Sequence, residues 1–247
     1  MSKLMKSEWR DRISHWVRTL KDDFYQPLGE IQWEAFRTNE QLSLGEAKKE
    51  QFVSVKPGFT WGNTYEYCWM KGHIQLSEEA EGKRIVMNLK PDGEATLFVN
   101  DKAFGTYRAS WVNESHHYIV DNVLSRCAKG DEQFDIMMEV YAGHYYPEAP
   151  TGGCATGPVL PGSYTDKLEE GKRRTLGRCT YGIWNEDAYQ LFMDVDTLGR
   201  LLEVLDKTSL RAAKIAKALE QFTLIVDFEQ ERDARIDSYK KAREALK

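Results

Sequence analysis

The sequence lacks any apolar run that could cross a membrane. None of its uninterrupted apolar stretches approaches the roughly 20 residues that a membrane-spanning helix requires. The first residues, MSKLMKSEWRDRISHW, also contain no apolar core of the kind that secretory signals carry. These absences argue against a membrane protein and favour a cytoplasmic location.

An excess of positive charge is also missing. The 247 residues include 34 Lys and Arg against 39 Asp and Glu, which gives a formal net charge of -5. Nucleic acids and anionic membranes bind basic surfaces, so this charge argues against both as partners. With 41% hydrophobic and 30% charged residues, the composition is that of a globular protein with one large domain or two small ones.

Cysteines are few and widely spaced. Cys68, Cys127, Cys154 and Cys179 form no C-x-x-C motif. A chain of this length can bury enough apolar surface to fold without disulfides, which favours reduced thiols in the cytosol. Four cysteines can also be paired in three ways, and the sequence leaves those pairings open.

Apolar spacing predicts an α+β chain that begins with a helix. Over residues 1–30, apolar side chains recur every three or four positions, as expected for an amphipathic helix. Over residues 31–145 the period becomes two, as in the alternation of Ile31, Trp33 and Ala35. Turn signals such as KPG and KPDGE separate the short runs. This pattern predicts an antiparallel β-sandwich or jelly roll.

The rest of the chain divides into a connection and a helical segment. Residues 146–184 hold many Pro and Gly and predict a long surface connection. Residues 185–247 return to helical spacing, with Asn185 and Ser209 as expected N-caps. The final stretch, ARIDSYKKAREALK, has a thin apolar stripe that predicts weak packing. It has no stop signal, so we expect the helical segment to lead into a further domain.

The aromatic stretch WGNTYEYCWMKGHIQL raises the possibility of a sugar-binding surface. Tyr65, Tyr67 and Trp69 alternate with other residues, which is strand spacing, and we interpret these rings as filling the sandwich core. A carbohydrate-binding module is the alternative, and it would require rings exposed on loops. The candidates for stacking on sugar are Trp61, Trp111, Tyr145 and Tyr146.

No catalytic or metal-binding motif stands out. Cys68 and His73 lie five residues apart, and His116 and His117 are adjacent, so neither pair matches a metal-ligand spacing. The sequence contains no G-x-S-x-G motif, P-loop or G-x-G-x-x-G motif. The 39 acidic residues offer too many pairs to identify a glycosidase couple. We therefore predict no catalytic residue and no metal ligand in this chain.

Two blocks of the sequence carry a family resemblance. WGNTYEYCWMKGHIQL and GKRIVMNLKPDGEATLFVNDKAFG resemble the N-terminal domain of α-mannosidases of the cytosolic or vacuolar type, in glycoside hydrolase family 38. The first block matches a W-G-x-T-x-x-x-x-W strand of that family. The second supplies its G-E-x-x-x-x-V-N strand through Gly93, Glu94, Val99 and Asn100. The segment from Asn185 to Glu229 is similar to the helical region of bacterial members.

The resemblance implies a galactose-binding-like β-sandwich, then helices, then a catalytic domain. That domain would hold a divalent metal, zinc or cobalt, and hydrolyse terminal α-mannosides of glycans with retention. Its G-H-x-H-I-D motif is absent here, since KGHIQL has Gln75 where Asp would be needed. We therefore expect this chain to be inactive alone and to support its own catalytic domain, with homo-oligomer contacts as a further expectation. The alternatives are the carbohydrate-binding module and an interaction domain with an exposed apolar helical face.

Overall fold

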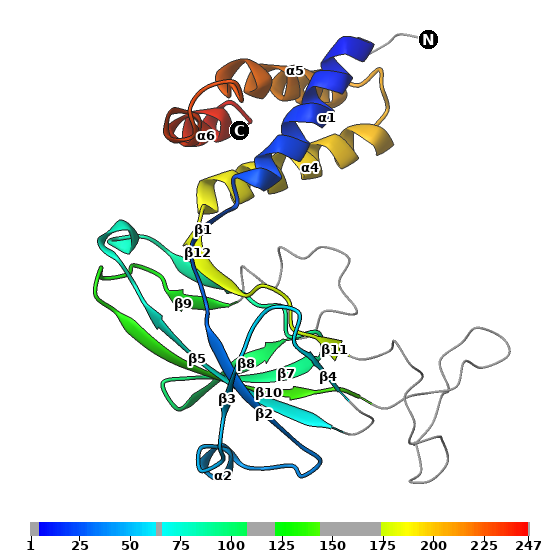
Figure 1. Cartoon of the computed structure of the whole chain (residues 1–247). Coiled ribbons are helices and arrows are strands. Elements are labelled where there is room, and N and C mark those ends of the chain that lie inside the picture. The colour runs from blue at the N-terminus through cyan, green and yellow to red at the C-terminus, as the bar shows by residue number, and fades with distance from the viewer. Residues whose placement is uncertain (1–4, 63–65, 108–121, 144–173, 247) are drawn as a thin grey trace, which may run out of the picture. The chain divides into compact units, whose positions relative to one another are not determined.

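The computed structural model describes residues 5–62, 66–107, 122–143 and 174–246. The chain forms two compact units, which we call the sandwich unit and the helical unit (Figure 1). The sandwich unit comprises Pro27–Ile183, and the helical unit combines Met1–Gln26 with Trp184–Lys247. Across the described ranges, no helix is both long enough and apolar enough to cross a membrane.

The larger sheet of the sandwich unit has six strands and is antiparallel throughout. In spatial order its strands are β3 (Val53–Val55), β2 (Trp33–Thr38), β5 (Tyr67–Gln75), β10 (Gln133–Tyr141), β7 (Glu94–Val99) and β8 (Lys102–Tyr107). The central strands β2, β5, β10 and β7 come from distant parts of the sequence. The order of the strands therefore brings together residues that no local pattern links.

The second sheet has four strands, and a small third sheet has two. The four strands are, in order, β1 (Tyr25–Glu30), β12 (Thr180–Trp184), β6 (Ile85–Asn88) and β9 (Val123–Ser125). The small sheet pairs β11 (Arg174–Thr175) with β4 (Thr60–Trp61). Two short helical turns, α2 (Leu44–Ala47) and η1 (Glu78–Ala80), complete the described part of the unit.

The core of the sandwich unit lies between its two main sheets. The alternation in residues 31–35 is confirmed, because Ile31, Trp33 and Ala35 are all buried in this core. Ile85 and Met87 of β6 join them from the opposite sheet. Apolar side chains at every second position thus meet across two antiparallel layers. The predicted β-sandwich with flanking helices is confirmed.

A smaller cluster covers the other face of the six-stranded sheet. Ala47 of α2, Trp69 of β5 and Met137 of β10 are its buried members. The expectation that Tyr67 and Trp69 fill the sandwich core is therefore corrected. Neighbouring strand residues point to opposite faces, and it is Cys68 that faces the core between the sheets. Tyr65 lies outside the described residues.

Two predicted segments differ from the structure in their boundaries. Residues 1–30 are helical only over α1 (Ser7–Asp22), after which β1 begins. Pro27 is tolerated in β1 because this strand forms an edge of its sheet, where a missing N–H breaks no interior ladder. The described part of the predicted connection, residues 174–184, contains β11 and β12. Residues 144–173 lie outside the described ranges.

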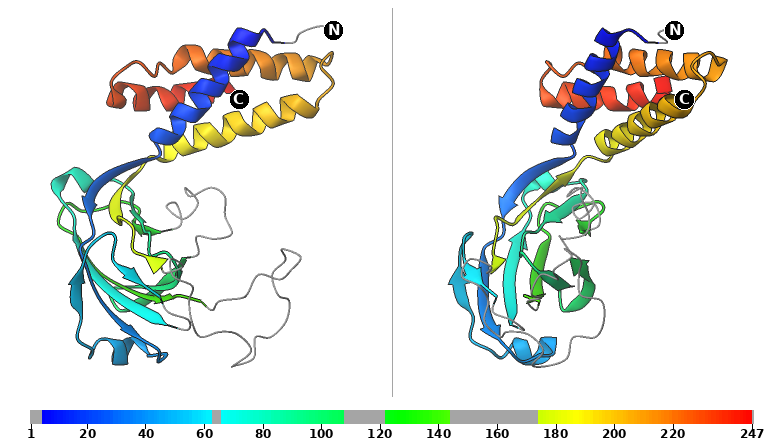
Figure 2. Two further views of the ribbon diagram at one scale, coloured as in Figure 1. Left: turned by 45° about the vertical axis from the view of Figure 1, so that its right-hand side comes forward. Right: turned by 90° about the vertical axis from the view of Figure 1, so that its right-hand side faces the viewer.

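The helical unit consists of α1, α4 (Glu186–Val204), α5 (Leu210–Ile225) and α6 (Arg232–Leu246). These helices pack side by side in both views of Figure 2. The two predicted N-caps are confirmed. Asn185 Oδ1 accepts a hydrogen bond from the Ala188 amide at 3.2 Å, and Ser209 Oγ accepts one from the Ala212 amide at 3.1 Å. Each cap satisfies a backbone donor that the first helical turn leaves free.

The last helix packs better than its thin apolar stripe predicts. α6 contacts both α4 and α5, and its Tyr239 is fully buried. The prediction of weak packing is therefore wrong. That prediction considered only apolar spacing. Part of the attachment of α6 is polar, because Arg235 and Tyr239 donate hydrogen bonds to Asp23 at the end of α1.

Candidate functional site

A cavity of about 490 Å³ opens on the outer face of the six-stranded sheet, and we call it the sheet cavity. Strand register builds its floor: Glu34 pairs with Lys71, Lys71 with Met137, and Met137 with Phe98. These residues belong to four adjacent strands and share one face of the sheet. These four residues therefore form a row across the strands, from the charged pair Glu34 and Lys71 to the apolar pair Met137 and Phe98.

The walls of the sheet cavity come from segments outside the central strands. Phe52 precedes β3, and Lys48 follows α2. Lys48 forms an ion pair with Asp101, which lies in the turn between β7 and β8. Asn100 and Asp101 both have positive φ angles, 48° and 66°, as a two-residue hairpin turn requires. The hairpin thus places the Asp101 carboxylate where Lys48 can reach it.

Charges in the sheet cavity are arranged in pairs. Lys71 Nζ lies 2.7 Å from Glu34 Oε2 and 4.6 Å from the centre of the Phe52 ring. His73 Nδ1 lies 2.8 Å from Asp135 Oδ1 in the neighbouring register pair. The cavity therefore offers hydrogen-bond donors and acceptors, and each of its two lysines has a carboxylate partner.

A second cavity of about 400 Å³ is lined by Tyr67, Glu139 and Tyr141, among others. Oε1 of Glu139 is buried without a hydrogen-bond partner among the described residues, and burial raises the pKa of this carboxyl group. Burial and the charge of Glu139 raise the pKa of Tyr67. The rings of Tyr67 and Tyr141 lie 5.0 Å apart. Sequence spacing could not single out Glu139 among 39 acidic residues.

The residues predicted to stack on sugar do not form a described surface. Trp61 is fully buried and belongs to the core between the sheets, contrary to the expectation that it lies exposed in a loop. It lies in β4, and the pairing of β4 with β11 explains its position. Trp111, Tyr145 and Tyr146 lie outside the described residues. The described structure therefore leaves Trp61 no free face for a sugar ring.

The described residues do not fit the divalent metal that the resemblance implies for a catalytic domain. Among them, no group of three or more His, Cys, Asp or Glu side chains is placed to hold a metal ion. Cys68 faces the core, whereas the exposed His73 forms its ion pair on the outer face of the sheet. His116 and His117 lie outside the described residues.

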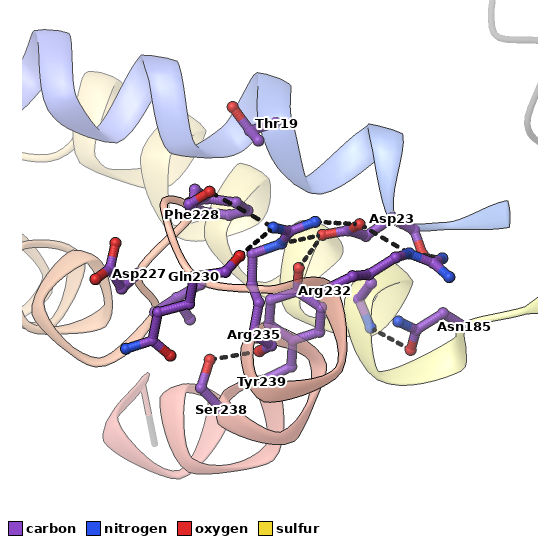
Figure 3. Close-up of polar contacts among 12 residues, drawn as sticks. Thr19, Asp23, Asn185, Asp227, Phe228, Gln230, Arg232, Arg235, Ser238 and Tyr239 are labelled. Carbon is purple, nitrogen blue, oxygen red and sulfur yellow. Dashed lines mark hydrogen bonds and ion pairs between the residues drawn. The ribbon is translucent and has the colours of Figure 1, made fainter. Parts of the chain in front are cut away.

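The helical unit contains a buried ionic cluster around Asp23 (Figure 3). Arg235 Nη2 donates to Oδ1 of Asp23 at 2.8 Å, and Arg235 Nε donates to Oδ2 at 2.7 Å. Arg232 donates to Oδ1 at 3.2 Å, and the Tyr239 hydroxyl donates to Oδ2. Burial would raise the pKa of Asp23, but hydrogen bonds from Arg235 and Tyr239 lower it below its usual value. The cluster is satisfied internally and joins helices, so we assign it a structural role.

The sheet cavity was not predicted from the sequence. Period-two alternation places Glu34, Lys71 and His73 on the outward face of their strands, and this signal was available. The pairing order β2-β5-β10-β7 was not available, because it links strands that are distant in sequence. The covering segment around α2 carried no periodic signal.

Part of the chain resembles solved structures of a bacterial β-glucuronidase. One is β-glucuronidase from Ruminococcus gnavus in complex with C6-substituted uronic isofagomine, with 14% identity and a TM-score of 0.36 over 64% of this chain and 29% of that chain. Another is Ruminococcus gnavus β-glucuronidase, with 13% identity and a TM-score of 0.36 over 64% of this chain and 28% of that chain. The chain thus spans less than a third of the length of these enzymes.

Comparison of the sequence with protein-family models gives a more specific result than the comparison with solved structures. A search of curated proteins finds no match. A family model described as alpha-mannosidase, jelly roll domain, matches residues 27–153, which is more than half of the chain. The matched range falls within the sandwich unit, Pro27–Ile183. The chain therefore belongs to the family of alpha-mannosidase jelly roll domains.

Proposed function

We propose that this chain is the non-catalytic N-terminal portion of a metal-dependent, retaining α-mannosidase that removes terminal α-mannosides from glycans. The observation that carries this proposal is the family match over residues 27–153, which is to a jelly roll domain of alpha-mannosidase. In this proposal the nucleophile and the divalent ion, zinc or cobalt, belong to a separate catalytic domain. The sandwich and helical units then serve as its structural support.

The proposal includes a cytoplasmic enzyme with reduced thiols. Cys68, Cys127 and Cys179 are free in the structure. Free thiols are typical of the reducing cytosol, whereas secreted proteins commonly pair their cysteines. The free thiols support a cytoplasmic location. Fractionation of cells that produce the protein would test that location.

A contact role for the helical unit is a second candidate function. Val204 is 80% exposed, Leu210 72% and Leu224 60%, and all three belong to α4 or α5. Exposed apolar side chains favour contacts with another protein surface, here the catalytic domain or a second copy of the chain. Light scattering of the purified chain, compared with a Val204→Glu, Leu224→Lys double variant, tests self-association. A larger mass for the unchanged chain alone would support this candidate.

Hydrolysis of an aryl α-mannoside tests the main proposal. The 247-residue chain would be assayed alone, with zinc and cobalt added in turn, beside a longer polypeptide that carries the catalytic domain. We expect no turnover by the chain alone and metal-dependent turnover by the longer polypeptide. Turnover by the 247-residue chain alone would overturn the assignment of a non-catalytic role. An inactive longer polypeptide would remove the α-mannosidase assignment.

A further inference from the structure

The polar groups of the sheet cavity form exposed ion pairs that add little to the stability of the fold. The side chains of Lys71 and Glu34 are 47% and 49% exposed, and those of His73 and Asp135 are 51% and 77% exposed. Exposed ion pairs contribute little to the free energy of unfolding, because water screens them and their side chains lose entropy on pairing. The two pairs lie on the same face of the sheet, because Lys71 and His73 are two residues apart in β5. These side chains are therefore accessible to a ligand.

The aromatic side chains of the sheet cavity rest on other aromatic rings. The ring of Phe98 stacks on that of Trp69, with centroids 6.1 Å apart and an angle of 19° between planes. The ring of Phe52 meets that of Phe36 edge to face, with centroids 4.8 Å apart. Trp69 is itself buried, so the floor that supports Phe98 does not need to form on binding. A preformed surface reduces the entropy lost when a ligand binds.

The balance of charge limits what the ligand can be. Each of the lysines lies beside a carboxylate, Lys48 beside Asp101 and Lys71 beside Glu34, so neither offers an uncompensated charge to an anion. The remaining carboxylate, that of Asp135, lies 2.8 Å from the Nδ1 atom of His73 and is not paired with a lysine. Yet an ammonium group carries three donors and a carboxylate accepts several hydrogen bonds, so both retain capacity after pairing. The cavity therefore favours an uncharged ligand with many donors and acceptors.

We propose that the sheet cavity binds a neutral saccharide. A pyranose ring has an apolar face of C–H groups, which suits Phe98 and Met137, and a rim of hydroxyl groups, which suits Lys71 and Asp135. The volume of about 490 Å³ lies within the range of small-molecule sites. This inference rests on the lining residues alone and not on the proposed α-mannosidase function. A negative result for saccharide binding therefore does not contradict the α-mannosidase proposal, and the reverse also holds.

Binding can be followed on the intact 247-residue chain by nuclear magnetic resonance. The methyl signal of Met137, labelled with carbon-13 and assigned through a Met137→Leu variant, reports on the floor of the sheet cavity. The probes are methyl α-mannoside, methyl β-glucoside and methyl β-galactoside, with glucuronate and inorganic phosphate as charged comparisons. We expect at least one neutral glycoside to shift the Met137 signal in a saturable way.

Two lining variants and a matched control locate the binding. Asp135→Ala removes an exposed acceptor, and Phe98→Ala removes the stacking ring. Arg178→Ala is the control, because Arg178 forms an exposed 2.8 Å pair with Glu30 and does not line the cavity. We expect Asp135→Ala to weaken binding about tenfold, the loss typical of one hydrogen bond to a charged group, and Arg178→Ala to leave it unchanged. The side chain of Asp135 is exposed, so Asp135→Ala should not disturb packing. This variant therefore tests binding even if Phe98→Ala changes the fold.

Three outcomes would overturn the inference. The first is the absence of any saturable shift at Met137 with all three neutral glycosides. The second is equal binding by Asp135→Ala and the unchanged chain, which would place the ligand elsewhere. The third is tighter binding of glucuronate or phosphate than of every neutral glycoside, which would contradict the argument from paired charges.

Discussion

Asp23 and Arg235 join the first and last helices of the chain across 212 residues of sequence. The guanidinium of Arg235 donates to both carboxylate oxygens of Asp23, at 2.8 and 2.7 Å, and the Asp23 side chain is only 3% exposed. Paired, planar hydrogen bonds of this kind fix orientation as well as distance. The helical unit therefore closes through a polar contact between α1 and α6, alongside its apolar packing.

Replacing Asp23 by Asn should destabilise the helical unit strongly. The change leaves the guanidinium of Arg235, which is only 15% exposed, without its counter-charge. Breaking a fully buried pair costs about 3–5 kcal/mol, so we expect a loss near the lower end of that range. Urea unfolding followed by far-ultraviolet circular dichroism would measure the loss. Asp22→Asn is the matched control, since the neighbouring Asp22 is exposed and should change stability by less than about 0.5 kcal/mol. Equal losses in the two variants would show that the cluster has no special role.

The contribution of Asp23 should also depend on pH in a defined direction. Because its pKa is lowered in the folded chain, its contribution is present above the unfolded value of about 3.9 and is lost as the pH falls through the folded value. The difference in unfolding free energy between the unchanged chain and Asp23→Asn should therefore shrink on acidification. A difference that stays constant from neutral to acidic pH would contradict the lowered pKa.

Local patterns predicted the elements of this fold better than their contacts. Alternation placed Ile31, Trp33 and Ala35 in the core, and cap chemistry identified the starts of α4 and α5. Both signals depend only on neighbouring residues, so they can be read from a single sequence. The bond between Asp23 and Arg235 depends instead on how α1 packs with the later helices, which no local spacing records.

The site was less predictable than the fold for a related reason. An exposed tryptophan and a buried one look alike in sequence, and Trp61 is buried because β4 pairs with a strand more than 100 residues later. The sheet cavity likewise requires β10 to lie between β5 and β7. Alternation could predict that Lys71 and His73 face one way, but not that Asp135 and Phe98 would join them.

Glu139→Gln should stabilise the sandwich unit near neutral pH, whereas Asp23→Asn should destabilise the helical unit. Burial raises the pKa of Glu139, so the charged form penalises folding above the unfolded value of about 4.3. That penalty fades as the pH falls through the folded pKa, and the advantage of the variant should fade with it. Urea midpoints at neutral and acidic pH would measure this, with the exposed Glu50→Gln as control.

A second readout separates charge from packing in the Glu139→Gln variant. The charge of Glu139, together with burial, raises the pKa of Tyr67. Removing that charge should lower the pKa of Tyr67, which an ultraviolet titration of tyrosine can detect by comparison with Tyr67→Phe. An unchanged tyrosine titration would mean that any gain in stability has another origin.

The described cysteines should react at very different rates. Burial raises the pKa of Cys68 to about 12 and also raises the pKa of Cys179, and thiolates are the reactive form. Cys127 is exposed. In a Cys154→Ser background, a thiol reagent should label Cys127 quickly and the other two only after denaturation. Cys127→Ser should abolish the fast reaction, and rapid labelling of native Cys68 would contradict the buried position.

Gly72→Ala should destabilise the sandwich unit, because Trp33 covers Gly72 across the register between β2 and β5. A Cβ at Gly72 would lie 2.7 Å from Cγ2 of Ile31 and 3.0 Å from the Trp33 ring, too close without a shift of either core side chain. Overpacking of this kind costs about 1–3 kcal/mol. Gly105→Ala in β8 is the matched control, since nothing lies within 4 Å of its Cβ and alanine restricts the unfolded chain.

Denaturant unfolding followed by tryptophan fluorescence would compare the two glycine variants. We expect a lower midpoint for Gly72→Ala and an unchanged or slightly higher midpoint for Gly105→Ala. A core that accepts the extra methyl group at Gly72 without loss would mean that Trp33 and Ile31 can move apart.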